Sequence, residues 1–294
     1  MDMNKSTIQL LQKKYFAAFL KGISLYLLCA FIVLFNTSLS AQGNLLIAPH
    51  RVVFDGQKRS IEVNLANTGQ DSAKYSISFL QYRMTDDGSY EEVTTPDPGQ
   101  NFADKNIRFF PRTVILGPSE SQIVKLQLIK SDELTPGEYR SHLYFRALPN
   151  QKALGEEELK KDTSSISIKI IPIFGITIPV IIRVGESTTV SSITDLKLEK
   201  TNEGKNNLLL TIRRTGNMSA FGDVSVFHIA PNGKETQIGI YTAFAVYTPN
   251  LLRKLQIALE DKPVVDMSKG TIRVLFSSQS DTKPVKLATA DLLL

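Results

Sequence analysis

The side chains that most often carry chemistry are few in this 294-residue chain and lie far apart. The chain has three histidines, His50, His142 and His228, and a single cysteine, Cys29. It contains no nucleophile elbow, phosphate-binding loop, dinucleotide fingerprint or H-E-x-x-H motif. No second candidate ligand neighbours His142 at metal spacing, so we expect no metal site. The sequence therefore predicts a protein that is not an enzyme and needs no cofactor.

The basic charge of the chain is concentrated at its N-terminus. The net charge is +5 and the pI about 9.1. Residues 1–41 contain four lysines and one aspartate, which supply +3 of that charge. Elsewhere the basic residues do not form clusters with interleaved aromatic residues, as a nucleic-acid groove requires. We expect no nucleic-acid partner.

Residues 1–41 have the pattern of a secretory signal peptide. Four lysines precede an apolar run at 22–35, and a stretch of mostly small residues follows at 38–41. The run is shorter than the roughly 20 residues that span a bilayer, which favours cleavage after Ala41 over a retained membrane anchor. Cys29 lies in this run, so the exported chain has no thiol. The predicted location is the periplasm, with no stable anchor.

The exported chain has the pattern of β-strands throughout. From residue 45 on, β-branched and aromatic residues recur in runs about ten positions apart, separated by Gly, Pro, Asn and Asp. In one such run Ile61, Val63 and Leu65 alternate with polar residues, as in a half-buried strand. The sequence predicts an all-β fold with two immunoglobulin-like β-sandwich domains, residues 42–184 and 185–294. A charged loop is expected at 148–164.

Several charged or titratable residues are interpreted as solvated rather than functional. The acidic pairs at 86–87 and 91–92 flank a glycine turn, and Arg213 and Arg214 close a strand before Gly216. His142 is expected at the surface or in an interface.

The segment 165–184 is longer and more apolar than an ordinary strand of five or six residues. An unpaired apolar edge strand is an aggregation hazard unless another strand pairs with it, and Pro172 and Pro179 favour an edge position. Three interpretations stay open: burial in the chain's own core, a transmembrane helix broken by the two prolines and Gly175, and pairing with the incomplete sheet of a partner. Alternation of isoleucine with Ser, Lys and Thr favours a strand over the helix. The even positions form one apolar row of Ile166, Ile168, Ile170, Phe174, Ile176 and Ile178.

Five short motifs follow one another along the exported chain: APHRVVFDG at 48–56, Asn67, PSESQ at 118–122, GEYRSH at 137–142 and the long strand that ends at Arg183. In this order they resemble the periplasmic pilus-assembly chaperones of the PapD type. The resemblance covers the whole exported chain and implies two immunoglobulin-like domains at an angle, with a cleft between them. It also implies secreted pilin-like subunits and an outer-membrane usher as partners.

The resemblance further implies roles for individual residues. Arg51 matches the cleft arginine that anchors a subunit's C-terminal carboxylate, and Arg183 is a second candidate. The family's cleft lysine falls at Pro179, so this chain departs from the pattern there. An ion pair with Asp55 is the alternative role for Arg51. The residues implied to fill the groove of a strand-deficient subunit are Ile166, Ile168, Ile170, Phe174 and Ile176.

The alternative function is that of a two-domain structural or adhesive secreted protein. In that case the apolar strand stays in its own sheet, or pairs with a second copy to form a dimer.

Overall fold

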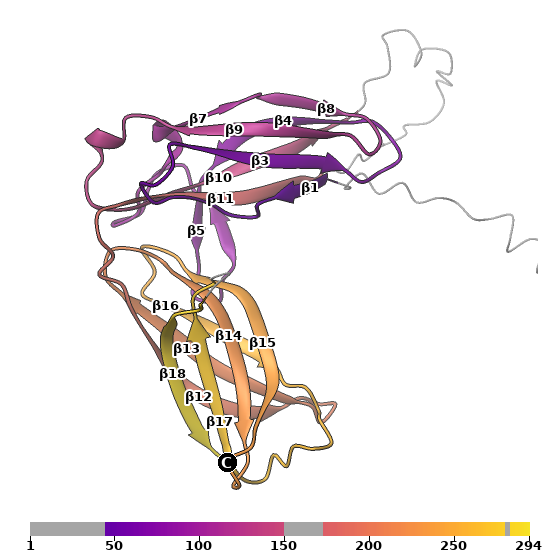
Figure 1. Cartoon of the computed structure of the whole chain (residues 1–294), viewed down its shortest axis with the longest axis vertical. Helices are drawn as coiled ribbons and strands as arrows, with labels where there is room; N and C mark the ends of the chain where they lie inside the picture. Colours follow the sequence, from indigo (N-terminus) through magenta and orange to yellow (C-terminus); the bar gives the residue numbers. More distant parts are fainter. Residues whose placement is uncertain (1–44, 150–172, 280–282) are drawn as a thin grey trace, which may run out of the picture. The chain divides into compact units, whose positions relative to one another are not determined.

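The computed structural model describes residues 45–149, 173–279 and 283–294 (Figure 1). The predicted signal peptide and most of the predicted charged loop lie outside the described residues. So do Ile166, Ile168, Ile170 and Pro172 of the predicted apolar strand.

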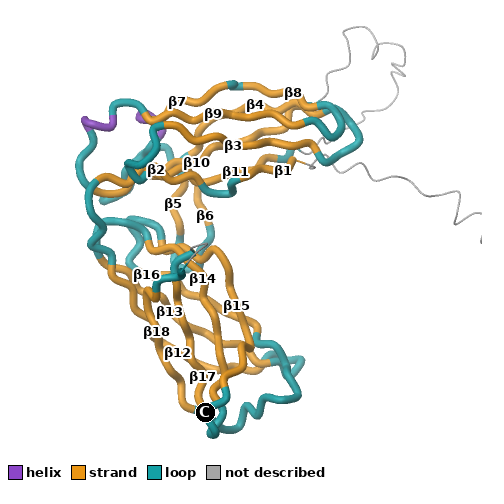
Figure 2. Tube along the Cα trace, viewed as in Figure 1, coloured by secondary structure: helices purple, strands orange, loops and turns teal. Residues whose placement is uncertain are grey.

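The described residues are almost entirely strands and turns (Figure 2). No helix in these ranges is long and apolar enough to cross a membrane. Two short 3-10 helices occur, at Asp104–Asn106 and Ser131–Glu133. The strands are β1 (Leu45–Ala48), β2 (Val52–Phe54), β3 (Ser60–Asn67), β4 (Ala73–Leu80), β5 (Tyr82–Met84), β6 (Tyr90–Glu92), β7 (Ile107–Phe110), β8 (Thr113–Leu116), β9 (Ser121–Leu128), β10 (Gly137–Leu148), β11 (Gly175–Val184), β12 (Val190–Lys200), β13 (Asn206–Thr215), β14 (Ala220–Ile229), β15 (Glu235–Val246), β16 (Leu252–Ala258), β17 (Thr271–Ser277) and β18 (Lys286–Leu293).

The strands form two sandwiches, which confirms the predicted fold class. In the first, the sheet β1-β3-β9-β7 faces the sheet β2-β11-β10-β4-β8. If the strands are lettered along the chain, β1, β3, β9 and β7 correspond to strands A, B, E and D of an immunoglobulin fold. Strands β4, β10 and β11 correspond to C, F and G, and β2 and β8 extend this second sheet at its two edges. In the second, the sheet β12-β13-β16 faces the sheet β15-β14-β17-β18.

Side-chain alternation along the strands determines each core. In β3, Val63 and Leu65 are fully buried, whereas Glu62 and Asn64 between or beside them are exposed. Each sandwich holds its own cluster of buried apolar residues between its two sheets. Because neither cluster depends on a disulfide, burial of apolar surface supplies the main driving force for both.

Strand β11 has two neighbours over only part of its length. It pairs with β10 antiparallel along its whole length, from Gly175 to Val184, and with β2 in parallel only over Val180–Ile182. Among the described residues, no strand covers the other side of Gly175–Ile178. The expected edge strand is therefore an edge over its first half and an interior strand over its last residues.

The hairpin of β5 and β6 connects the two sandwiches. The carbonyl oxygen of Asp86 at its tip accepts the amide of Lys254 at 2.6 Å, and the carbonyl of Met84 accepts Asn250 Nδ2 at 2.7 Å. The Met84 side chain is buried in an apolar cluster with Ile181, Ala245 and Tyr247. The predicted solvation of the acidic residues at 86–87 and 91–92 is confirmed. The docking of the hairpin on the second sandwich was not predicted.

Asn67 joins the ends of three segments in the first sandwich. Its Nδ2 donates to the carbonyl oxygens of Asp71, Leu116 and Gly117 at 2.7, 3.1 and 3.0 Å, and its Oδ1 accepts the amide of Gly69 at 2.9 Å. The side chain thus replaces the backbone bonds that a strand would supply at this corner.

We predict that Asn67→Ala lowers the free energy of unfolding by about 3 kcal/mol, because buried carbonyl groups lose their donor. Asn67→Asp should cost at least as much, since it faces those carbonyls with a second acceptor. Asn64→Ala, at an exposed position of the same strand, should change stability by less than about 0.5 kcal/mol. Urea denaturation measures all three, and a tolerated Asn67→Asp would contradict the account.

Candidate functional site

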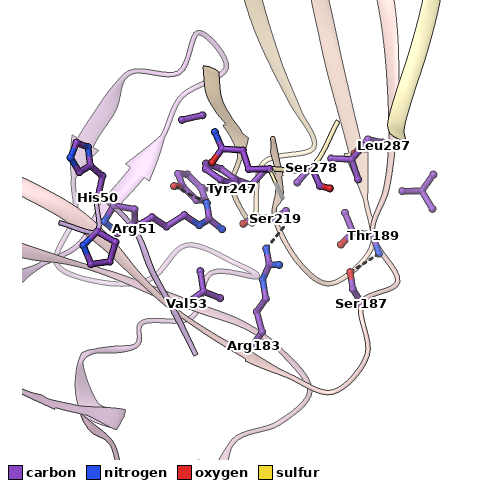
Figure 3. Close-up of a pocket in the computed structure, with 18 of the residues that line it drawn as sticks. His50, Arg51, Val53, Arg183, Ser187, Thr189, Ser219, Tyr247, Ser278 and Leu287 are labelled. Carbon is purple, nitrogen blue, oxygen red and sulfur yellow. Dashed lines mark hydrogen bonds between the residues drawn. The ribbon is translucent and has the colours of Figure 1, made fainter. Parts of the chain in front are cut away.

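A pocket of about 940 Å³ is lined by residues of both sandwiches (Figure 3). Its lining contains Arg51, Arg183 and Lys286 together with several hydroxyl groups, but no aspartate or glutamate. Among the described residues, no three His, Cys, Asp or Glu side chains are placed to hold a metal ion. The pocket is therefore suited to binding an anionic group of a partner.

Arg51 is held in place by aromatic rings of the second sandwich. Its guanidinium carbon lies 3.9 Å from the centroid of the Phe221 ring and 5.6 Å from that of Tyr247. Its Nη1 donates to the Tyr247 hydroxyl at 3.4 Å. Burial lowers the pKa of Arg51, yet a guanidinium remains charged in proteins.

Arg51 forms no ion pair with any acid among the described residues, Asp55 included. The Asp55 carboxylate instead accepts the amide of Gln57 at 3.1 Å. Stacking on aromatic rings fixes the Arg51 guanidinium but leaves N–H donors that bind no carboxylate of this chain's described residues. These donors can bind a carboxylate of a partner.

Arg183, the second candidate, is already engaged. Its Nε donates to Glu138 Oε2 at 3.1 Å, and its Nη2 donates to the carbonyl oxygen of Ser219 at 3.0 Å (Figure 3). The fully buried Glu138 carboxylate also accepts the amide and hydroxyl of Ser219. These bonds connect the two sandwiches, and they pair the Arg183 guanidinium with a buried carboxylate.

The register of β2 and β11 places Arg51 at the end of the uncovered edge. Val52 pairs with Val180, so Arg51 lies next to Pro179 in the same register, and both line the pocket. The amide of Ala147 donates to the carbonyl of Phe174 at 2.9 Å. Because the antiparallel ladder alternates, odd-numbered residues of β11 direct their backbone groups away from β10. Pro179 is odd-numbered and therefore costs β10 no hydrogen bond.

The even-numbered row of β11 passes from exposed to buried. Phe174 and Ile176 are 51% and 37% exposed, whereas Ile178, Val180 and Ile182 are buried in the core of the first sandwich. A single row of side chains thus contributes to this core at one end and extends beyond it at the other.

His142 is buried, which corrects the surface position that the sequence analysis allowed for it. Its ring, 3% exposed, makes edge-to-face contacts with Tyr82 and Tyr90 at centroid distances of 5.0 and 5.6 Å. Both tyrosines belong to the β5–β6 hairpin, which covers this face of β10. Burial and the charge of Arg140 lower the pKa of His142 to about 3.

Arg214 is also buried, which corrects the prediction that it is solvated at the end of its strand. It is 3% exposed, and its guanidinium donates to the carbonyl oxygens of Gly216, Met218 and Asn250 at 2.9 to 3.0 Å. These carbonyls belong to loops rather than strands, and Arg214 supplies the donors that a neighbouring strand would.

The chain is similar in structure to pilus chaperones, the family that its motifs resemble. The similar chains include the YadV chaperone (12% identity, TM-score 0.43), a chain of the CsuC–CsuE chaperone–tip adhesion subunit pre-assembly complex of Acinetobacter baumannii (14%, 0.42) and the CupB2 chaperone of Pseudomonas aeruginosa (13%, 0.40). They cover 83 to 85% of this chain and 98 to 100% of the other chains. No protein-family profile and no curated protein matches the sequence. At TM-scores below 0.5, the function has to be inferred from the residues themselves.

We predict that His142 makes the protein sensitive to acid. Its pKa in the folded state, about 3, lies below the unfolded value near 6.5. The unfolded state therefore binds more protons between these values. The free energy of unfolding should fall as the pH is lowered through this window, by up to about 1.4 kcal/mol per pH unit. His142→Phe keeps the ring contacts but removes the titration.

The measurement is urea denaturation of the wild type, His142→Phe and the control Asn64→Ala at pH 7 and 4.5. Asn64 is exposed and has no titratable side chain. Relative to the wild type, His142→Phe should gain about 2 to 3 kcal/mol on acidification, and Asn64→Ala should gain nothing. An identical pH dependence in all three proteins would overturn the prediction.

Proposed function

We propose that this protein is a periplasmic chaperone that binds secreted pilin-like subunits by donating β11 and delivers them to an outer-membrane usher. It acts by binding, with no catalysis and no cofactor. The observation that carries the proposal is the uncovered edge of β11, which displays Phe174 and Ile176 and ends at Arg51. The signal-peptide pattern of residues 1–41 supports the periplasmic location.

The position of β2 defines where a subunit strand can pair. A strand added along Gly175–Ile178 occupies the same side of β11 as β2 does and must stop where Val52 begins. Backbone groups of Gly175 and Thr177 are available to it, by the alternation of the ladder. Main-chain hydrogen bonds then supply affinity, and side-chain pockets supply specificity.

The position of Arg51 defines the direction of that strand. If the subunit's C-terminal carboxylate is bound by Arg51, the strand must run from the level of Gly175 toward Pro179. It therefore runs parallel to β11, as β2 does. The same arrangement leaves Phe174 and Ile176 directed into the subunit's own core in place of its missing strand. Ile166, Ile168 and Ile170 would continue this row and remain a sequence prediction.

We predict that the double variant Phe174→Asp, Ile176→Asp loses subunit capture by at least tenfold, because two carboxylates would have to enter an apolar groove. Its stability should change little, since both side chains are exposed. Co-purification of a co-expressed strand-deficient subunit measures capture, and thermal denaturation measures stability.

Ile240→Asp is the matched control, because Ile240 is an exposed isoleucine of the second sandwich. Retained capture by the double variant would contradict the proposal. If the double variant instead lost only self-association, the alternative of a structural or adhesive protein that pairs with its own copy would be favoured.

We predict that Arg51→Met weakens subunit binding by about 10- to 100-fold, the range expected for a lost charge-assisted pair of hydrogen bonds. Extending the subunit by a C-terminal Gly-Ser tail, which moves its carboxylate, should cause a similar loss. Combining both changes should add little, because they remove one interaction. Fully additive losses would show that Arg51 does not bind the carboxylate.

A further inference from the structure

A second buried arginine lies behind the pocket. Arg140 on β10 is 3% exposed, and its guanidinium carbon is 4.4 Å from the centroid of the Tyr247 ring. Tyr247 also accepts a hydrogen bond from Arg51, so one ring contacts both guanidinium groups. Arg140 itself does not line the pocket.

Arg140 forms no ion pair and no hydrogen bond with a carboxylate of the described residues. Its Nη2 donates to the carbonyl oxygens of Tyr82 and Thr248 at 3.3 and 3.5 Å, whereas Nε and Nη1 have no partner there. Glu138 is the one acid whose charge reaches both Arg140 and Arg51, and Arg183 already pairs with it. Four buried or half-buried cations, Arg51, Arg140, Arg183 and Arg214, thus lie near one anion.

The position of Arg140 also explains how the chain tolerates Pro179. In the register of β10 and β11, His142 lies opposite Pro179 and Arg140 lies opposite Ile181, and opposite residues share a face of the sheet. His142 is neutral, because its pKa is about 3. On this face of β10, Arg140 is therefore the cation that lies closest in register to Pro179, which carries no charge.

We infer that Arg140 is the second cation of the carboxylate anchor, acting through Tyr247 on an anion bound at Arg51. The inference rests on the proposed function. Arg140 is a positioning residue: it holds the Tyr247 ring and adds a buried positive charge beside Arg51. The two ring-centroid distances, 4.4 and 5.6 Å, place the guanidinium carbons of Arg140 and Arg51 at most about 10 Å apart. At an effective dielectric constant near 20, such a charge changes carboxylate affinity about tenfold.

The test uses the full exported chain and two synthetic probes, an acetylated octapeptide of alternating threonine and valine with a free C-terminal carboxylate, and the same peptide as its C-terminal amide. The ratio of their dissociation constants at low ionic strength measures the anchor alone. Arg140→Met should reduce this ratio about tenfold by weakening acid binding only, and Arg140→Lys should restore most of it. Arg108→Met, which removes an exposed charge on β7, should leave it unchanged.

The outcomes separate the two claims. If the wild type binds both peptides equally, the anchor fails, and the role of Arg140 fails with it. If Arg51→Met abolishes the preference for the acid while Arg140→Met keeps it, the inference for Arg140 alone is overturned. Equal weakening of both peptides by Arg140→Met would show a packing role only.

Should Arg140→Met fail to fold, the wild type still provides a test. The ¹⁵Nε resonance of Arg140 should shift on addition of the acid peptide and stay in place with the amide. A resonance whose chemical shift is unchanged by either peptide would overturn the inference.

Discussion

The ability of β11 to pair with a second protein depends on its unequal coverage. β10 pairs with the whole strand, whereas β2 covers only Val180–Ile182. One row of side chains therefore secures the strand in its own core through Ile178, Val180 and Ile182 and extends past that core at Phe174 and Ile176. A strand that is anchored at one end and uncovered at the other can pair with a second protein without unfolding its own domain.

Buried charges hold the two sandwiches around this strand. The Glu138 carboxylate binds Arg183 of β11 and the backbone and hydroxyl of Ser219, and removing one partner of such a buried group is costly. The hairpin of β5 and β6 adds a second connection over the outer face of β10. Together they keep the aromatic residues of the second sandwich in contact with Arg51, which belongs to the first sandwich.

The sequence was sufficient for the fold and insufficient for the buried polar groups. Period-two alternation, as at Val63 and Leu65, depends on local geometry and so predicts strands and core faces correctly. His142 and Arg214 look like ordinary surface residues in sequence, because what covers them comes from distant segments. The same holds for Arg140, whose partners Tyr82 and Thr248 lie 58 and 108 positions away.

The most direct test of the account is hydrogen exchange of single β11 amides, in the isolated protein and in its complex with a co-expressed strand-deficient subunit. Ile176 and Ile178 donate toward β10 and should be protected in both states. Gly175 and Thr177 face the uncovered edge, so they should exchange rapidly alone and become protected in the complex. Protection of Thr177 in the isolated monomer, or rapid exchange in the complex, would contradict strand donation.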